Sequence, residues 1–336
     1  MSMFRKISLS VKPEINTGFG NNPSNYGGRF LNKDGEANIE KKGISFLERI
    51  SWYHTMLLLP RWKFFTIIFL FYFCINLVFG SIYFLIGVQN LGLVPSSSNL
   101  SNFGESFFFS TQTFTTVGYG RISPNGFLSS SVAALEALLG LLSLALATGL
   151  LYGRFSQPVA YLRFSHNALL APFKDMNALM LRVAPFKNTN LTDVVANVTL
   201  GMTVEENGIS VNRFYQLDLE YDKVNSLSLS WTIVHPITPQ SPLYNFTKND
   251  FENIKGEVMV FIRAFDDLFS NIVVARTSYV FDEIHYGARF EPMYERAPSG
   301  DKTIIHLDKI NSFFPAVLNT TSANTVEEIK DDTLET

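Results

Sequence analysis

The stretch "FFFSTQTFTTVGYGR", residues 107–121, lies between two long apolar segments and decides the fold. Gly118 and Gly120 flank a tyrosine in this stretch, although glycine weakens a helix and exposes its backbone. Irregular backbone is tolerated at membrane depth only where it lines a cavity or is buried in protein. The stretch therefore predicts a re-entrant loop whose backbone has a chemical task.

The two flanking segments have the length and composition of membrane helices. Residues 64–88 carry no charged side chain, and residues 127–152 carry only Glu136. At 1.5 Å per residue, such segments cross a hydrocarbon core of roughly 30 Å. We expect membrane helices over residues 62–88 and 127–155, with a pore helix over residues 103–115 between them, in a membrane α-helical pore.

The pentapeptide "TVGYG", residues 116–120, follows the expected pore helix. Carbonyl groups that all point at one axis require backbone with positive φ, which glycine adopts without a Cβ penalty. A ring of such carbonyls from four chains replaces the hydration shell of a potassium ion. We expect a homotetramer with K+ ions bound at the first four residues of a selectivity filter formed by Thr116, Val117, Gly118, Tyr119 and Gly120.

The composition excludes several other classes of protein. The 336 residues are 46% hydrophobic and 17% charged, with a net charge of -3, which argues against a nucleic-acid partner. The single cysteine, Cys74, excludes an intrachain disulfide, and the five histidines lack metal-ligand spacing. The sequence contains no nucleophile elbow or phosphate loop, so we expect no enzymatic activity and no organic cofactor.

Cations gather at the outer ends of the two apolar segments. Between the segments, residues 89–126 carry only Glu105 and Arg121. The positive-inside rule therefore places both termini in the cytoplasm of a multi-pass protein of the cell (inner) membrane. Residues 44–60 are amphipathic and predict an interfacial helix after a cytoplasmic segment, residues 1–43, with a plain helical leader as the alternative.

The pattern changes after residue 158. Short β-branched and aromatic segments, such as "LTDVVANVTLGMTV" and "GEVMVFIRAF", alternate with turn residues and predict a C-terminal all-β sandwich over residues 159–320. The acidic residues 321–336 are expected to be disordered. Two acidic pairs on the sandwich, residues 266–267 and 282–283, are interpreted as solvated faces.

Residues 29–295 resemble the inward-rectifier potassium channel family, and its prokaryotic members most closely. The segments that carry the resemblance are "RFLNKDGEANI", "TVGYG", "LALATGLLYGRFSQP", "WTIVHPITPQSPLY" and "ARTSYVFDEIHYGARF". The resemblance implies a tetramer with an interfacial slide helix and two membrane helices per subunit. It also implies a cytoplasmic immunoglobulin-like sandwich that extends the pore, with a narrowing loop at residues 263–275.

The resemblance also implies roles for individual residues. The positions that match the pore-lining gate are Leu144, Thr148, Gly149 and Tyr152. Ordinary helix packing is the alternative for Leu144 and Tyr152. The positions that match part of the phosphoinositide site are Arg61, Trp62, Lys63 and Arg154. We therefore expect membrane lipids, anionic lipids or phosphoinositides among them, as partners.

Some positions depart from the family pattern. Many relatives place a glutamate behind the filter, whereas this chain has Gln112, so a neutral hydrogen bond to Arg121 is expected to replace an ion pair. Leu144 and Arg263 stand where strong rectifiers have acidic residues, and Gln157 stands where a cation is common. Polyamine or magnesium block needs negative charge along the pore, so weak rectification is expected.

Glu136 is the one carboxylate inside an apolar segment. An intramembrane carboxylate is a functional candidate, but a buried polar group also needs hydrogen-bond partners. We expect Glu136 to support the filter through a hydrogen bond to the pore helix near Gln112 or Thr113.

The sequence favours a potassium-selective channel of the inward-rectifier type, gated by the sandwich and by lipids. A pore gated by a nucleotide-binding domain would need a GxGxxG motif after residue 158, and the sequence has none there. A voltage sensor would need a further apolar helix with spaced arginines. The remaining alternative is a membrane-anchored sandwich that serves as an adaptor or receptor, with a loop that does not conduct.

Overall fold

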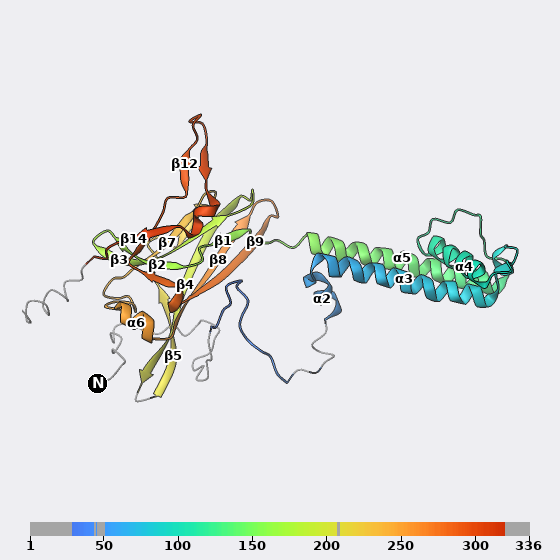
Figure 1. Ribbon diagram of the computed structural model, residues 1–336, viewed down its shortest axis with the longest axis horizontal. Coiled ribbons are helices and arrows are strands. Elements are labelled where there is room, and N and C mark those ends of the chain that lie inside the picture. Colours follow the sequence, from blue (N-terminus) through green and yellow to red (C-terminus); the bar gives the residue numbers. More distant parts are fainter. Residues whose placement is uncertain (1–28, 44, 46–50, 207–208, 320–336) are drawn as a thin grey trace, which may run out of the picture. The chain divides into compact units, whose positions relative to one another are not determined.

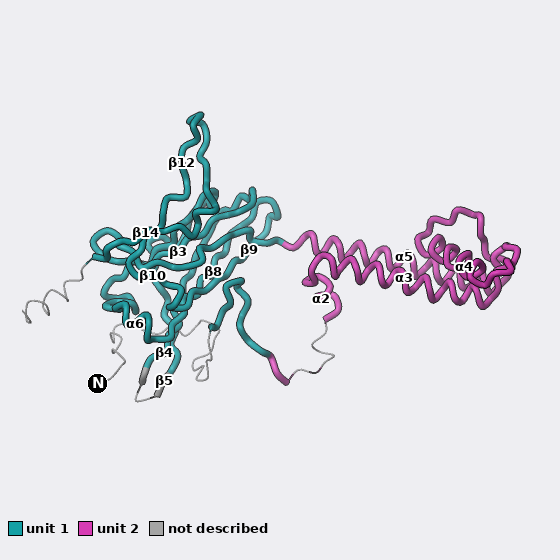
Figure 2. The backbone as a smooth tube through the Cα atoms, in the orientation of Figure 1, with its two compact units in different colours: residues 1–40, 158–336 teal, residues 41–157 magenta. Residues whose placement is uncertain are grey.

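The computed structural model describes residues 29–43, 45, 51–206 and 209–319. The expectations for residues 1–28 and 321–336, and for most of the first half of the interfacial helix, lie outside the described residues. The chain divides into two compact units, Met1–Glu40 with Pro158–Thr336, and Lys41–Gln157 (Figure 2).

The unit Lys41–Gln157 is helical. Its elements are α2 (Trp52–Leu58), α3 (Arg61–Ile86), the 3-10 helix η1 (Val88–Leu91), α4 (Asn99–Phe114) and α5 (Phe127–Phe155). Figure 1 shows α3 and α5 side by side, with the shorter α4 beside one end of the pair and α2 beside the other. By length and composition, α3 and α5 are the two helices of the described chain that qualify as membrane spans.

Local sequence explains where these helices begin and end. Gly87 (φ 100°) follows α3, and Gly126 (φ 96°) precedes α5, so both breaks use backbone that disfavours other residues. The helix α4 begins four residues before the expected pore helix. Asn102 explains this earlier start, because its side chain exchanges two hydrogen bonds with the backbone of Ser96 and fixes the entry loop.

The other unit contains two five-stranded sheets. The first consists of β1 (Leu162–Phe164), β3 (Met176–Pro185), β2 (Ala168–Phe173) and β10 (Ile284–Tyr286), with β7 (Trp231–Pro236) paired to β3. The second consists of β5 (Ile209–Leu217), β4 (Leu191–Glu206), β8 (Gly256–Asp266) and β9 (Asn271–Val280), with β6 (Lys223–Ser226) paired to β4. All the pairings in these sheets are antiparallel except β2 with β10.

Smaller elements complete this unit. Two two-stranded antiparallel sheets pair β11 (Ala288–Phe290) with β14 (Phe313–Pro315) and β12 (Tyr294–Arg296) with β13 (Thr303–Ile305). The short helices are α6 (Lys248–Asn253), η2 (Phe281–Glu283) and η3 (Leu307–Asn311).

The core of the sandwich comes from alternate residues of both sheets. Leu179 and Leu181 of β3 face Val258, Val260 and Ile262 of β8 in one buried cluster. Each fully buried aliphatic side chain contributes about 1.5–3 kcal/mol relative to exposure. Two apolar helices with a C-terminal β-sandwich confirm the expected fold class.

The interpretation of the acidic pairs as solvated faces is wrong for two of their members. Asp266 is fully buried, and its Oδ1 accepts the N–H groups of Leu268 and Phe269 at 2.9 and 3.3 Å. A buried carboxylate must be hydrogen-bonded, and this one closes the β8–β9 turn. Glu283 forms two ion pairs, which are described below.

Candidate functional site

Two glycines let the pore helix α4 come close to both membrane helices. A Cβ built on Gly140 of α5 would lie 2.1 Å from the carbonyl oxygen of Phe114, the last residue of α4. A Cβ built on Gly80 of α3 would lie 3.0 Å from Cα of Phe107. Backbone contacts this close leave no room for a side chain, so the two glycines fix the position of α4.

The last turn of α4 holds the backbone of the expected filter. The N–H groups of Val117 and Gly118 donate to the carbonyl oxygen of Gln112 at 2.9 and 3.3 Å, and that of Thr116 donates to Thr113 at 3.0 Å. The C-terminal end of a helix carries a partial negative charge, which favours a cation beside it. The filter segment therefore starts at a point that suits a cation.

Positive φ recurs at alternate residues of the filter segment. Thr116, Gly118 and Gly120 have φ of 59°, 52° and 81°. The glycine values are those that carbonyls aimed at one axis require, and Thr116 adopts the same region although it has a Cβ. Between them, the side chains of Val117 and Tyr119 are 52% and 79% exposed in the single chain. The segment thus offers a row of backbone groups without filling the space around it.

Glu136 joins all three long helices. Tyr83 of α3 donates its hydroxyl to Glu136 Oε2 at 2.6 Å, and Ser110 of α4 donates to Glu136 Oε1 at 2.5 Å. Ser110 Oγ also lies 3.1 Å from Asn76 Oδ1, and all four of these residues are buried. The expected hydrogen bond between Glu136 and the pore helix is present, and its partner is Ser110, two residues before Gln112. Ser110 lies on the α4 face that meets α3 and α5, which the sequence spacing did not reveal.

Arg121 also differs from the expectation. Its guanidinium forms an ion pair with Glu105 of α4, and Nη1 lies 3.4 Å from Glu105 Oε1. Arg121 therefore pairs with Glu105, which lies two helical turns before Gln112 on α4, and the expected neutral hydrogen bond between Gln112 and Arg121 is absent from the described contacts. The contribution of Gln112 comes instead from its backbone carbonyl, as described above.

The expected gate residues lie on α5 beyond the contact with α4. Leu144 is 62% exposed and Tyr152 is 74% exposed in the single chain, and Thr148 lies exposed between them. They follow Gly140 at steps of four residues, so they continue along the helix past the end of α4. The helix is unbroken at Gly149, where an added Cβ would meet no atom within 4 Å.

The expected lipid-binding residues flank the junction of α2, α3 and α5. Arg154 Nη1 lies 3.4 Å from the carbonyl oxygen of Met56, and its guanidinium lies 5.1 Å from the ring centroid of Phe64. Arg61, Trp62 and Lys63 are exposed at the start of α3. Arg154 therefore ties α2 to α5, whereas the other three side chains are exposed, with Lys63 Nζ 5.5 Å from the ring centroid of Trp62.

Residues 29–40, which we call the strap, belong to the sandwich unit. The strap turns at Gly35 (φ 86°), where an added Cβ would lie 2.7 Å from the carbonyl oxygen of Arg276 on β9. The buried Glu257 of β8 accepts the backbone N–H groups of Phe30 and Leu31 at 2.5 and 3.0 Å. Because a carboxylate receives both bonds, the strap is attached to the second sheet by charge-assisted hydrogen bonds.

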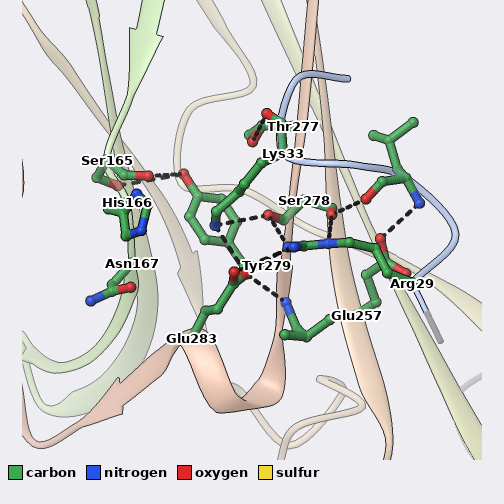
Figure 3. Close-up of polar contacts among 12 residues, drawn as sticks. Arg29, Lys33, Ser165, His166, Asn167, Glu257, Thr277, Ser278, Tyr279 and Glu283 are labelled. Carbon is green, nitrogen blue, oxygen red and sulfur yellow. Dashed lines mark hydrogen bonds and ion pairs between the residues drawn. The ribbon is translucent and has the colours of Figure 1, made fainter. Parts of the chain in front are cut away.

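Glu283 binds the strap at a second point (Figure 3). Its Oε2 lies 2.6 Å from Arg29 Nη2 and 3.0 Å from Lys33 Nζ. Both cations also donate to the carbonyl oxygen of Ser278 at 3.0 Å, and Lys33 Nζ lies 3.9 Å from the ring centroid of Tyr279. Burial would raise the pKa of Glu283, but the hydrogen bonds from Lys33 and Arg29 outweigh it and hold that pKa below its ordinary value.

The strap shows what sequence reasoning missed. The sequence assigns these residues a family resemblance and a share of the cytoplasmic positive charge, and it predicts a solvated face for Glu283. The signal that was available is the combination of Arg29 and Lys33 with a fixed turn at Gly35, which positions two cations on one side of a loop. Their acidic partner lies some 250 residues away, as the contact separations show, so no local pattern identifies it.

Known proteins share both units. Residues 162–331 match the family model of the inward rectifier potassium channel C-terminal domain, and residues 67–157 match the model described as ion channel. Inward rectifier potassium channel Kirbac3.1 of Paramagnetospirillum magnetotacticum is 33% identical over 281 residues, which cover 82% of this chain and 92% of the relative. The chain belongs to the inward rectifier potassium channel family.

Vertebrate relatives of this potassium channel are more distant. ATP-sensitive inward rectifier potassium channel 12 of Gallus gallus is 27% identical, over 85% of this chain and 73% of the relative. G protein-activated inward rectifier potassium channel 4 of Mus musculus is also 27% identical, over 79% of this chain and 68% of the relative. The resemblance to prokaryotic members of the family is thereby confirmed.

Proposed function

We propose that this membrane protein is one subunit of a homotetramer whose four segments Thr116–Gly120 form a potassium-selective filter. The observation that carries the proposal is the backbone of this segment, with positive φ at residues 116, 118 and 120 and its start held by the last turn of the pore helix. One chain supplies one strand of carbonyls. Four copies around an axis provide the ring that replaces the hydration shell of K+.

The surface of the single chain supports assembly. Along the proposed pore, Val117, Tyr119, Leu144 and Tyr152 are more than half exposed, although all four are large and apolar or aromatic. Exposed apolar surface of this extent marks a contact with lipid or with another chain. In the proposed tetramer, Val117 and Tyr119 point away from the axis and hold the filter diameter, while Leu144, Thr148 and Tyr152 line the pore.

The proposed topology places both termini and the sandwich in the cytoplasm of the cell membrane. The cations Arg61, Lys63 and Arg154 all lie at the same end of the two membrane helices, and the connection between the other ends has a net charge of zero. This asymmetry follows the positive-inside rule. Anionic lipid headgroups in that leaflet are the proposed ligands of Arg61, Trp62 and Lys63.

The chain provides two covalent routes by which the sandwich can gate the pore. One runs from β1 back to α5 across residues 156–161, and the other runs from the strap forward to α2 across residues 41–51. Because Glu257 and Glu283 hold the strap on the sandwich, a rearrangement of the sandwich pulls on both ends of the helical unit. We propose that gating uses both routes, with weak rectification because Leu144 and Arg263 supply no negative charge.

Flux measurements test this function. Purified protein in liposomes is expected to conduct K+ and Rb+, to exclude Na+, and to be blocked by Ba2+. The variant Gly118→Ala is expected to abolish selective flux, because a Cβ disfavours the positive φ at this position. The matched control Gly104→Ala changes a pore-helix glycine with open space around it. Equal Na+ and K+ flux, or no flux with an intact protein, would reject the proposal and favour a non-conducting adaptor or receptor.

A further inference from the structure

The connection between the two membrane helices contains one acid and one base, and they meet. Residues 89–126 carry Glu105 and Arg121 as their only charged side chains. Arg121 directly follows Gly120, the last filter residue, and Glu105 lies on α4 one turn before Phe109. The two side chains form an ion pair, in which both guanidinium nitrogens Nη1 and Nη2 approach the carboxylate.

A lone arginine at this position conflicts with cation conduction. In the proposed tetramer, Arg121 repeats four times around the end of the filter that lies away from Thr116. Rings of arginine or lysine favour anions in pores, whereas rings of acidic side chains favour cations. A ring of four unpaired guanidinium groups would therefore repel K+ at the point where the ions enter or leave the filter.

We propose that Glu105, acting through Arg121, is the counter-charge that makes the Arg121 ring compatible with K+ conduction. The inference rests on the proposed filter and tetramer. The last turn of α4 holds the first residues of the filter by backbone hydrogen bonds. The ion pair links the same helix to the residue that follows the filter. Each subunit thus fixes both ends of its own filter segment to one helix.

The exposure of the pair makes this role measurable. The side chains of Arg121 and Glu105 are 59% and 36% exposed, so salt in the outer solution screens their charges. The electrostatic role therefore predicts a defect that depends on ionic strength. A purely structural role of Glu105 predicts a defect that salt does not change.

Single-channel K+ conductance in planar bilayers separates these cases. At roughly 0.01 M ionic strength, where the Debye length is about 30 Å, Glu105→Gln is expected to lower conductance about threefold or more relative to wild type. At roughly 1 M, where it is about 3 Å, the ratio of variant to wild type is expected to approach one. The double variant Glu105→Gln/Arg121→Gln is expected to recover wild-type conductance at low ionic strength.

The control is Glu220→Gln, which breaks a similarly exposed pair with Lys174 (2.5 Å) on the sandwich and is expected to leave conductance unchanged. Wild-type conductance of Glu105→Gln at low ionic strength overturns the inference, as does a defect that persists in the double variant. If Glu105→Gln does not assemble, the double variant decides. A double variant that assembles and conducts supports the inference, and one that does neither overturns it. A wild-type protein that carries no K+ current contradicts the proposed function itself.

Discussion

Gly140 determines how closely the pore helix approaches α5. A Cβ at this position would lie 2.1 Å from the backbone oxygen of Phe114, a contact that no rotamer change relieves. We expect Gly140→Ala to displace the end of α4, to cost about 1–3 kcal/mol of stability, and to reduce K+ flux.

Thermal dissociation of the proposed tetramer and K+ flux measure the effect, with Gly104→Ala as the matched control. Gly104 lies in α4 with no atom within 4 Å of an added Cβ, so alanine is expected to stabilise the helix by up to about 1 kcal/mol. Equal behaviour of the two variants would contradict the close approach at Gly140.

Glu136 holds three helices together through two hydroxyl groups. Glu136→Ala leaves the buried hydroxyl of Tyr83 without its acceptor, at about 1–3 kcal/mol, whereas Ser110 keeps Asn76 Oδ1 at 3.1 Å as an acceptor. Glu136→Gln keeps the shape and one acceptor oxygen, so it is expected to retain more of the stability and flux than alanine does.

The dissociation temperature of the proposed tetramer is expected to be highest for the wild type, lower for Glu136→Gln and lowest for Glu136→Ala. Tyr83→Phe removes a single donor and is expected to cost less than Glu136→Ala. A fully active and stable Glu136→Ala protein would show that the bonds seen around Glu136 do not hold the pore helix.

At the level of single residues, the sequence predicts the candidate site residues better than it predicts their hydrogen-bond and ion-pair partners. The glycines of the filter and the buried Glu136 follow from chemistry that each residue carries by itself. The partners Ser110 and Glu105 depend on the rotation of α4 about its own axis. Apolar side chains surround most of that helix, with Phe103, Phe107, Phe108 and Phe109 on several faces, so its periodicity does not specify the rotation.

The strap is the element whose attachment depends most directly on charge. Glu283 has a pKa below the ordinary 4.5 because Lys33 and Arg29 outweigh the effect of burial. A carboxyl group with a lowered pKa in the folded chain contributes stability above its ordinary pKa and loses it as the pH falls through the lowered value. We therefore expect docking of the strap to be constant near neutral pH and to weaken below about pH 4.5.

Hydrogen exchange of the strap amides, corrected for the intrinsic pH dependence of exchange, measures this docking in the full chain. Glu283→Gln is expected to weaken docking by about 1–2 kcal/mol at neutral pH and to reduce the acid step. The matched control is Asp308→Asn, which changes an exposed acid on η3 whose Oδ1 lies 3.9 Å from His306 Nδ1. An unchanged acid step in Glu283→Gln would assign the pH dependence to another group.

The bounds of α5 agree with the predicted 127–155. The helix α3 ends at Ile86, two residues before the predicted 88, because Gly87 (φ 100°) leaves the helical conformation. The start of α4 lies four residues before the predicted one, because three of the four residues 99–102 are polar and local hydrogen bonds from Asn102 join this turn to the helix. The strap was missed because it pairs with β8 and β9 from the opposite end of the chain.

At the scale of the whole molecule, the two units differ in how much of their apolar surface they bury. The helical unit buries only a small apolar cluster, which includes Phe79, Tyr83 and Phe109, and leaves most of its apolar surface outward. The sandwich buries an extensive core between its two sheets. Composition predicted this division, because long uncharged segments and short alternating segments satisfy their backbone groups in different ways.

We propose that carbonyl groups of four copies of residues 116–119 bind dehydrated potassium ions in single file. The decisive measurement is a crystallographic map of the purified protein with Tl+ in place of K+, in which anomalous scattering locates the ions. We predict a tetramer with a row of anomalous peaks on its fourfold axis, level with the carbonyl oxygens of Thr116, Val117, Gly118 and Tyr119. A tetramer without peaks on the axis, or a protein that is not a tetramer, would contradict the account.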